Sequence, residues 1–124
     1  MTERLLAMGA WDDSILNEEI NVDFLDEIAE LDNDDILEAL EDACLLVINQ
    51  DNATEEEHLN GQAAATIAAI LAGAPFSAGE VVENYPFIRQ LMGEGSESLR
   101  VAAARVLEES EVDYDLEAYL EALN

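Results

Sequence analysis

The chain has 124 residues, of which 50% are apolar and 27% are charged, and its formal net charge at pH 7 is −26. This length and apolar content predict one domain whose core needs no disulfide, and they argue against disorder. The 30 acidic residues are opposed by four arginines and no lysine. Because such a surface repels phosphate groups, we expect no direct binding to nucleic acid or to a membrane.

The single cysteine and the apolar segments bear on the compartment. Cys44 has no second cysteine to pair with and lies among aliphatic residues, so it is expected in the core. The apolar stretch 5–11 is too short for a secretion signal and runs into two aspartates. The run 63–76 is shorter than the roughly 20 residues of a membrane-spanning helix. We therefore expect a cytoplasmic protein.

We expect a flexible N-terminal segment, 1–10, followed by a single helical domain, 11–124. Met8 is an alternative natural start. A first helix is predicted over about 17–31, because Asn17 is a good N-cap residue and an apolar stripe follows it. A second helix is predicted over about 35–49, where apolar residues recur at the spacing of one helix face.

The middle of the chain carries the strongest helix signal. Thr54 and Glu57 form a capping-box pattern, and the helix they open is expected to end near Ala72, before Gly73. Its second half, 63–71, is apolar on all sides. A helix of this kind is typical of the centre of a bundle, where alanines let neighbouring helices approach closely.

The last third predicts shorter helices. Ser77-Ala78-Gly79-Glu80 repeats the capping-box pattern and starts a short helix that Pro86 interrupts or ends. Ser96 is expected to cap a helix that reaches Glu109, and a final helix is expected from about Asp113. Since no alternating strand pattern occurs, the sequence predicts an all-α bundle of about five to six helices around the Ala-rich helix, about 55–72.

Two patterns resemble metal sites. Glu55 and His58 have the helical spacing of two ligands in di-iron bundles, but the chain has no second histidine to complete such a pair. The segment 32–35 resembles the start of a calcium loop, yet the fifth loop position is Ile36 and the twelfth is Ala43. Helix capping explains this segment better. We therefore predict no metal site and keep Glu55 and His58 as weak candidates.

Catalytic patterns are missing from the sequence. There is no nucleophile elbow, and neither Cys44 nor any serine has a histidine near it in sequence. The segment 93–95 lacks the third glycine and the preceding strand of a phosphate-binding loop. We predict no catalytic residue and no cofactor, and these absences argue against an enzyme without deciding the question.

Trp11 precedes the first predicted helix and is bordered by acids. One interpretation makes it an anchor that holds the N-terminal segment on the bundle. The other makes it an aromatic hot spot for a partner. The second interpretation gives a candidate partner-binding set: Trp11, Asp12, Asp13, Glu18 and Glu19.

The opening of the chain is similar to that of a known family. Met8-Gly9-Ala10-Trp11, Asn17-Glu18 and Asp23-Phe24-Leu25 resemble the start of the bacterial domain of unknown function 4259 family. The alanine-rich segment 55–71 is also similar to the family's middle. Asp12 and Ser14 depart from the glycines that the family carries after its tryptophan. The resemblance implies a bacterial cytoplasmic protein with Met8 as ancestral start, and it implies no activity.

Three hypotheses for function remain open. The first is an acidic interaction domain that binds a basic protein as an inhibitor, an immunity-type protein or a mimic of nucleic acid, because the charge is extreme and catalytic patterns are missing. The second is a domain that binds a metal or a small molecule through carboxylates and His58. The third is a structural subunit of an oligomer, in which 63–71 or 87–92 packs against a second chain.

Overall fold

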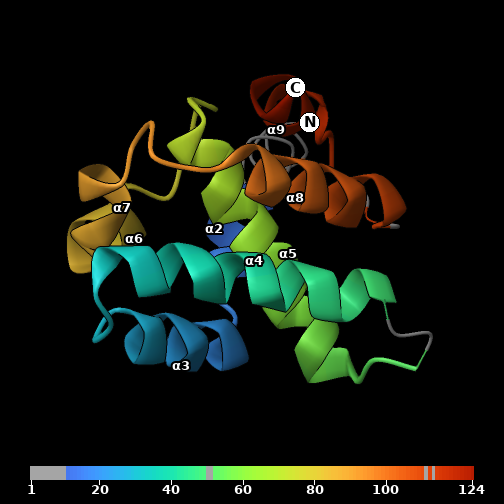
Figure 1. The fold of residues 1–124 in the computed structure, drawn as a ribbon, viewed down its shortest axis with the longest axis horizontal. Coiled ribbons are helices and arrows are strands. Elements are labelled where there is room, and N and C mark those ends of the chain that lie inside the picture. The colour runs from blue at the N-terminus through green and yellow to red at the C-terminus, as the bar shows by residue number, and fades with distance from the viewer. Residues whose placement is uncertain (1–10, 50–51, 111, 113) are drawn as a thin grey trace, which may run out of the picture.

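The computed structural model describes residues 11–49, 52–110, 112 and 114–124, and the predicted flexible segment 1–10 and the alternative start at Met8 lie outside them. Within these ranges the chain is all-α, as predicted, and no strand is present. The helices are α2 (Trp11–Leu16), α3 (Glu19–Ile28), α4 (Asn33–Asn49), α5 (Glu55–Leu71), α6 (Gly79–Asn84), α7 (Phe87–Gln90), α8 (Glu97–Glu109) and α9 (Glu117–Leu123) (Figure 1).

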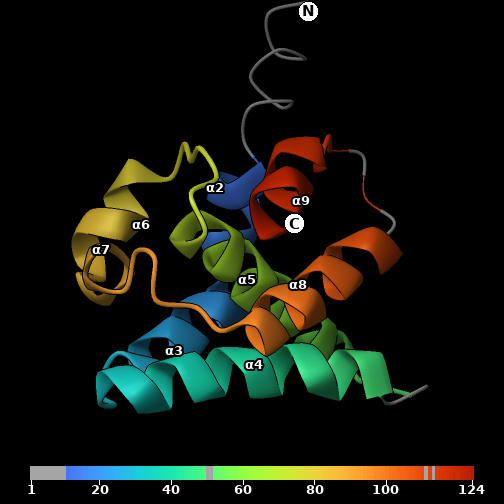
Figure 2. The ribbon, with the colours of Figure 1, turned by 45° about the horizontal axis from the view of Figure 1, so that its top comes forward.

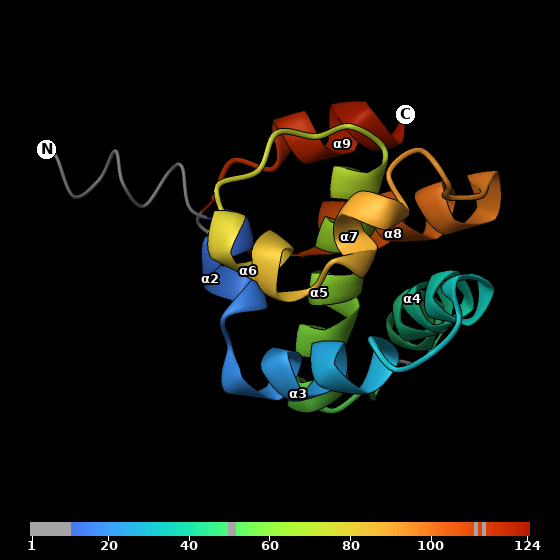
Figure 3. The same ribbon diagram turned by 90° about the vertical axis from the view of Figure 1, so that its left-hand side faces the viewer.

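The Ala-rich helix α5 is central, as its pattern predicted. Every residue from Ala63 to Leu71 is buried. The helix contacts α2, α3, α4, α7, α8 and α9. Figure 3 shows α2, α3, α4 and α9 arranged around it, and Figure 2 shows α6 and α7 on the opposite side of α5 from α8 and α9. Small side chains on α5 permit this close packing on several faces at once.

Two helix starts follow the predicted capping chemistry. At α5, the Thr54 hydroxyl accepts a hydrogen bond from the Glu57 backbone N–H, and the Glu57 carboxylate accepts one from the Thr54 N–H. At α8, the Ser96 hydroxyl accepts a hydrogen bond from the Leu99 N–H at 3.1 Å. Helix α8 ends at Glu109, also as predicted. These starts were predictable because both partners of each bond lie within three residues.

The predicted first helix, 17–31, is wrong in its bounds. One helix, α3, lies within this range, and Asn17 lies between it and the preceding helix α2. The Asn17 side-chain amide donates to the Asp13 carbonyl at 2.7 Å, at the end of α2. Glu18 takes the N-cap position of α3 without a side-chain hydrogen bond. Helix α3 ends at Ile28, and Leu31 beyond it is 43% exposed. The short helix α2 was not predicted.

The predicted capping box at 77–80 does not form. Ala78, and not Ser77, is the N-cap residue of α6, and an alanine side chain cannot accept the capping hydrogen bond. The backbone N–H groups of Ser77 and Ala78 donate instead to the distant Asp12 side chain. Pro86 separates α6 from α7, as expected. The last helix begins at Glu117, and Asp113 lies outside the described residues.

Helix α4 lies very close to α5 at one point. A Cβ atom added at Gly61 would lie 2.5 Å from Val47 Cγ2 and 3.2 Å from the Ala43 carbonyl oxygen. The Cys44 thiol lies 3.9 Å from the Gly61 carbonyl oxygen, in the same contact. Gly61 therefore sets the distance between the two helices. Among the described helices, none has both the length and the apolar character needed to cross a membrane.

Candidate functional sites

Trp11 is buried, with 4% of its surface exposed. Its indole N–H donates to the Thr66 hydroxyl of α5 at 3.0 Å, and that hydroxyl donates to the Gln62 carbonyl oxygen at 2.8 Å. The Tyr114 ring lies against the indole, with ring centroids 5.4 Å apart. These contacts attach α2 to the central helix and to the segment before α9.

Asp12 is fully buried next to Trp11. One of its oxygens accepts hydrogen bonds from the backbone N–H groups of Ser77, at 2.6 Å, and Ala78, at 2.9 Å. Its other oxygen accepts from the Tyr119 hydroxyl at 3.2 Å. Burial, the charge of Asp12 and this hydrogen bond raise the pKa of Tyr119. A single carboxylate thus connects α2, the start of α6 and α9.

The candidate partner-binding set is therefore divided between the interior and the surface. Trp11 and Asp12 lie inside the fold and present no surface for a partner, whereas Asp13, Glu18 and Glu19 are exposed. The five residues do not form one continuous surface. Partner binding through the three exposed acids remains a prediction.

The weak metal candidates lie in the first turn of α5. Glu55 and His58 are both exposed. The part of the chain that the structure describes contains no group of three or more His, Cys, Asp or Glu side chains able to hold a metal ion. At the segment that resembles a calcium loop, all four residues are exposed, and the Asp32 carbonyl accepts from the Ile36 N–H at 2.8 Å to begin α4.

Burial is the main cause of the raised pKa values of Cys44 and Tyr85, and nearby acids add to it in both cases. Burial, reinforced by the charge of Glu41, raises the pKa of the Cys44 thiol to about 12. This favours the unreactive thiol over the thiolate. At Tyr85, burial and a 2.6 Å hydrogen bond donated to Asp26 raise the pKa to about 12, and the charges of Asp26 and Asp23 add to the effect. Among the causes that act on these two groups, burial and acidic neighbours favour the protonated, less nucleophilic form of each.

The carboxylates of the described residues lie almost entirely at the surface. Asp12 is buried, Glu41 and Glu57 are half-buried, and the others are exposed. No arginine or lysine occurs between residues 11 and 88. Within the described part the one ion pair joins Arg105 to Glu109, at 3.3 Å, and both side chains are more than half exposed. Among the described residues, therefore, no acid of α3 or α4 forms an ion pair with a basic side chain.

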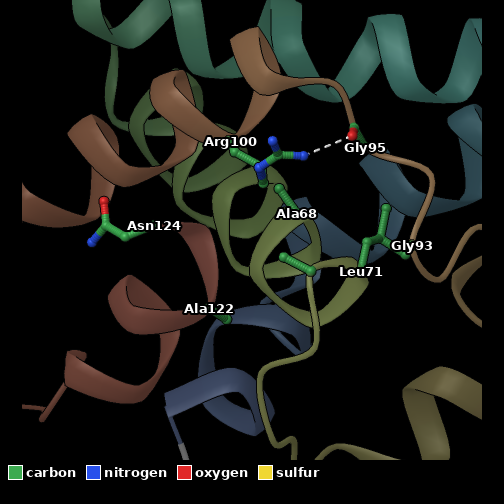
Figure 4. Close-up of a pocket in the computed structure, with 8 residues that line it drawn as sticks. Ala68, Leu71, Gly93, Gly95, Arg100, Ala122 and Asn124 are labelled. Atoms are coloured by element: carbon green, nitrogen blue, oxygen red, sulfur yellow. Dashed lines mark hydrogen bonds between the residues drawn. The ribbon is translucent and has the colours of Figure 1, made fainter.

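A cavity of about 270 Å³ lies where α5 and α9 end and α8 begins (Figure 4). Arg100 is the basic residue in its lining, which also includes Leu71, Ala72, Ala122 and Asn124. The Arg100 guanidinium donates a hydrogen bond to the Gly95 carbonyl at 2.9 Å. Because helix C-termini carry partial negative charge, the ends of α5 and α9 already attract this cation. Arg100 is thus accounted for by the fold.

Two shallow grooves follow opposite sides of α4. The first, of about 390 Å³, lies between α3, α4 and α5 and is lined by Phe24, Ala39, Asp42, Ala43, Leu46, Glu57 and Asn60. The second, of about 420 Å³, lies between α4 and α8 and is lined by Glu41, Leu45, Ile48, Asn49, Glu97, Ser98, Val101, Ala102 and Arg105. Both combine an apolar floor with charged side chains. Neither was predicted, because each draws on separate helices.

Comparison with known protein families, with curated proteins and with solved structures finds no match to this chain.

Proposed function

We propose that this protein is a small acidic interaction domain that binds a basic protein partner. The observation that carries the proposal is the excess of exposed carboxylates over basic groups: net charge −26, with one exposed ion pair among the described residues. Carboxylates without ion-pair partners create a strong negative potential that steers a positively charged protein into contact.

The helical core supports this proposal by holding the acids on a rigid scaffold. The exposed carboxylates of α3 and α4 lie on helices whose apolar faces are anchored by Leu25, Ile28, Ile36 and Leu40, all of them buried. Acids on fixed helices can match the spacing of basic groups on one particular partner, which an acidic disordered tail cannot do. The resemblance to the domain of unknown function 4259 family, and with it a bacterial cytoplasmic setting, remains part of the proposal.

The test compares the folded domain with a disordered acidic chain of equal net charge. Each is immobilised and exposed at low and at physiological salt to a panel of small basic proteins and to a bacterial lysate. We expect the folded domain to retain a particular basic protein that the disordered chain does not retain, with an association rate that falls steeply as salt rises. Equal retention by both chains at every salt concentration would overturn the proposal.

A further inference from the structure

The groove between α3, α4 and α5 has an apolar floor. Phe24 comes from α3, Ala39, Ala43 and Leu46 come from α4, and the N-terminal part of α5 closes the third side. Phe24, Ala39, Ala43 and Leu46 are all half-buried. The groove, at about 390 Å³, has room for one or two long side chains.

The charged groups that line this groove are acceptors. Asp42 is exposed and makes no ion pair within the described residues. Glu57 uses one carboxylate oxygen, Oε1, to accept from the Thr54 N–H, which leaves its second oxygen for another donor. The groove therefore presents two carboxylates above an apolar surface.

Asn60 adds an independent indication that a donor is missing. Its side-chain oxygen is buried and has no hydrogen-bond partner among the described residues. A buried carbonyl oxygen without a donor destabilises the fold, because it has lost its hydrogen bonds to water. Asn60 is one of the residues that line the groove, and the terminal torsion of an asparagine side chain is soft. A donor from a bound molecule would satisfy this oxygen.

The two grooves and the Arg100 cavity differ in their charged groups. The groove between α4 and α8 includes Arg105, and the cavity where α5 and α9 end includes Arg100. The groove between α3, α4 and α5 has no basic residue in its lining. Of these three hollows, it is the one whose lining has carboxylates that attract a cation and no arginine that repels it.

We propose that the groove between α3, α4 and α5 is the docking site for an apolar segment of the basic partner that carries a lysine or arginine. This inference rests on the proposed function and names the site of that function. The aliphatic stem of a lysine or arginine packs on Leu46 and Phe24, while its charged end reaches Asp42, Glu57 and Asn60. Long basic side chains combine an apolar stem and a charged head in this way.

The test uses two synthetic peptides of equal charge, one of lysine and leucine and one of lysine and serine. Their affinities are measured for the wild-type domain and for two matched double variants. The groove variant is Asp42→Asn with Leu46→Gln, and the control is Glu97→Gln with Val101→Gln in the groove between α4 and α8. Each pair removes one carboxylate and makes one apolar residue polar, so both change the charge equally.

We expect the groove substitutions to lower the affinity for the lysine–leucine peptide by about tenfold and the control substitutions to lower it by less than about twofold. The lysine–serine peptide, which binds through charge alone, should respond equally to both variants. Equal weakening of the lysine–leucine peptide by the two variants would overturn the groove proposal and leave the proposed function standing. If the domain binds both peptides no more tightly than a disordered acidic chain does, the proposed function itself is contradicted.

A mapping experiment on the wild-type domain covers the case in which the groove variant does not fold. Backbone amide signals are followed by NMR during titration with the lysine–leucine peptide. We expect the largest changes at Phe24, Ala39, Leu46 and Asn60. Changes centred instead on Val101 and Arg105 would place the peptide in the other groove and overturn the inference.

Discussion

Asp12 and the acids of α3 and α4 are the same chemical group in opposite settings. Asp12 is fully buried and accepts hydrogen bonds from two backbone N–H groups and one tyrosine hydroxyl. Asp13, its neighbour in the sequence, is exposed, like nearly all acids of α3 and α4. The difference shows that one carboxylate holds distant helices together, whereas the many exposed ones set the charge of the surface.

The comparison also separates the acid expected to stabilise the fold from the acids expected to affect partner binding. A buried carboxylate is tolerated only where fixed donors replace the water it has lost. An exposed carboxylate keeps its water and interacts mainly through long-range charge, which salt screens. We therefore expect substitution of Asp12 to affect folding, and substitution of the exposed acids to affect salt dependence and binding.

The largest effect is expected for Asp12→Ala. This change leaves the Ser77 and Ala78 N–H groups and the Tyr119 hydroxyl without their acceptor, and each buried donor left unpaired costs about 1–3 kcal/mol. We expect the free energy of unfolding to fall by about 3–5 kcal/mol in urea titrations at fixed salt. Asp12→Asn, which keeps an acceptor oxygen, should lose less. A loss below about 0.5 kcal/mol for Asp12→Ala would show that this carboxylate does not hold the fold.

A smaller effect is expected at Trp11, whose indole N–H donates to Thr66. Trp11→Phe removes this donor and part of the buried ring, and we expect a loss of about 1–3 kcal/mol. Thr66→Val leaves the indole N–H unpaired, and the double variant should lose less than the sum of the two single variants, because both remove the same bond. Additive losses would contradict this coupling.

Trp11 also provides a direct optical measurement, because it is the one tryptophan in the chain. Burial predicts blue-shifted emission that is protected from soluble quenchers. Emission typical of an exposed indole would restore the interpretation of Trp11 as a surface hot spot.

Local sequence signals predicted the parts of the fold that depend on local contacts. The starts of α5 and α8 follow from caps whose partners lie three residues apart, and the burial of α5 follows from its composition. Helix α2 has six residues and was missed, since such a short helix is held by tertiary contacts. Its anchors reach Thr66 and Ser77, 55 and 65 residues away. No local pattern carries that information.

The candidate site was less predictable for the same reason. Asp12 and Asp13 are adjacent and chemically identical, and they are distinguished by distant donors to Asp12, the N–H groups at 77 and 78 and the Tyr119 hydroxyl. The groove between α3, α4 and α5 draws on Phe24, Leu46 and Asn60, each of which fits an ordinary helix pattern alone. A sequence shows the faces of helices, but a groove depends on how separate helices pack.

Asp26 is an exposed acid that accepts a hydrogen bond from the Tyr85 hydroxyl, and the titration of Tyr85 tests this interaction. The Tyr85 pKa is raised to about 12 by burial and by the hydrogen bond to Asp26. The stabilisation linked to the protonated phenol is therefore complete below pH 10 and is lost as pH rises through about 12. We expect Asp26→Asn to lower the Tyr85 pKa towards 10, measured by ultraviolet absorbance titration against a Tyr85→Phe reference. An unchanged titration would mean that burial and the charge of Asp23 raise this pKa without Asp26.

The smallest effect is expected for the exposed acids near the C-terminal end of α3. Glu27 lies in its last turn and Glu30 just beyond, where the partial negative charge of the helix end opposes an acid. We expect Glu27→Gln with Glu30→Gln to increase the free energy of unfolding by about 0.3–1 kcal/mol at low salt, because it relieves both this opposition and the repulsion among neighbouring acids. Glu19→Gln, in the first turn of the same helix, should give a smaller change, since it also removes a favourable interaction with the helix N-terminus.

High salt provides the control for this last comparison. In about 1 M NaCl the Debye length falls to about 3 Å, so the advantage of the Glu27 and Glu30 variant over wild type should largely disappear. The wild-type protein should itself gain stability as salt rises from low concentration, because its exposed acids then repel one another less. Replacing sodium chloride with another monovalent salt should give the same result, since screening requires no specific ion. If the variant remains more stable than wild type at high salt, helix propensity or local packing is the cause of the gain. The exposed acids would then, like Asp12, affect stability through short-range contacts and not mainly through long-range charge.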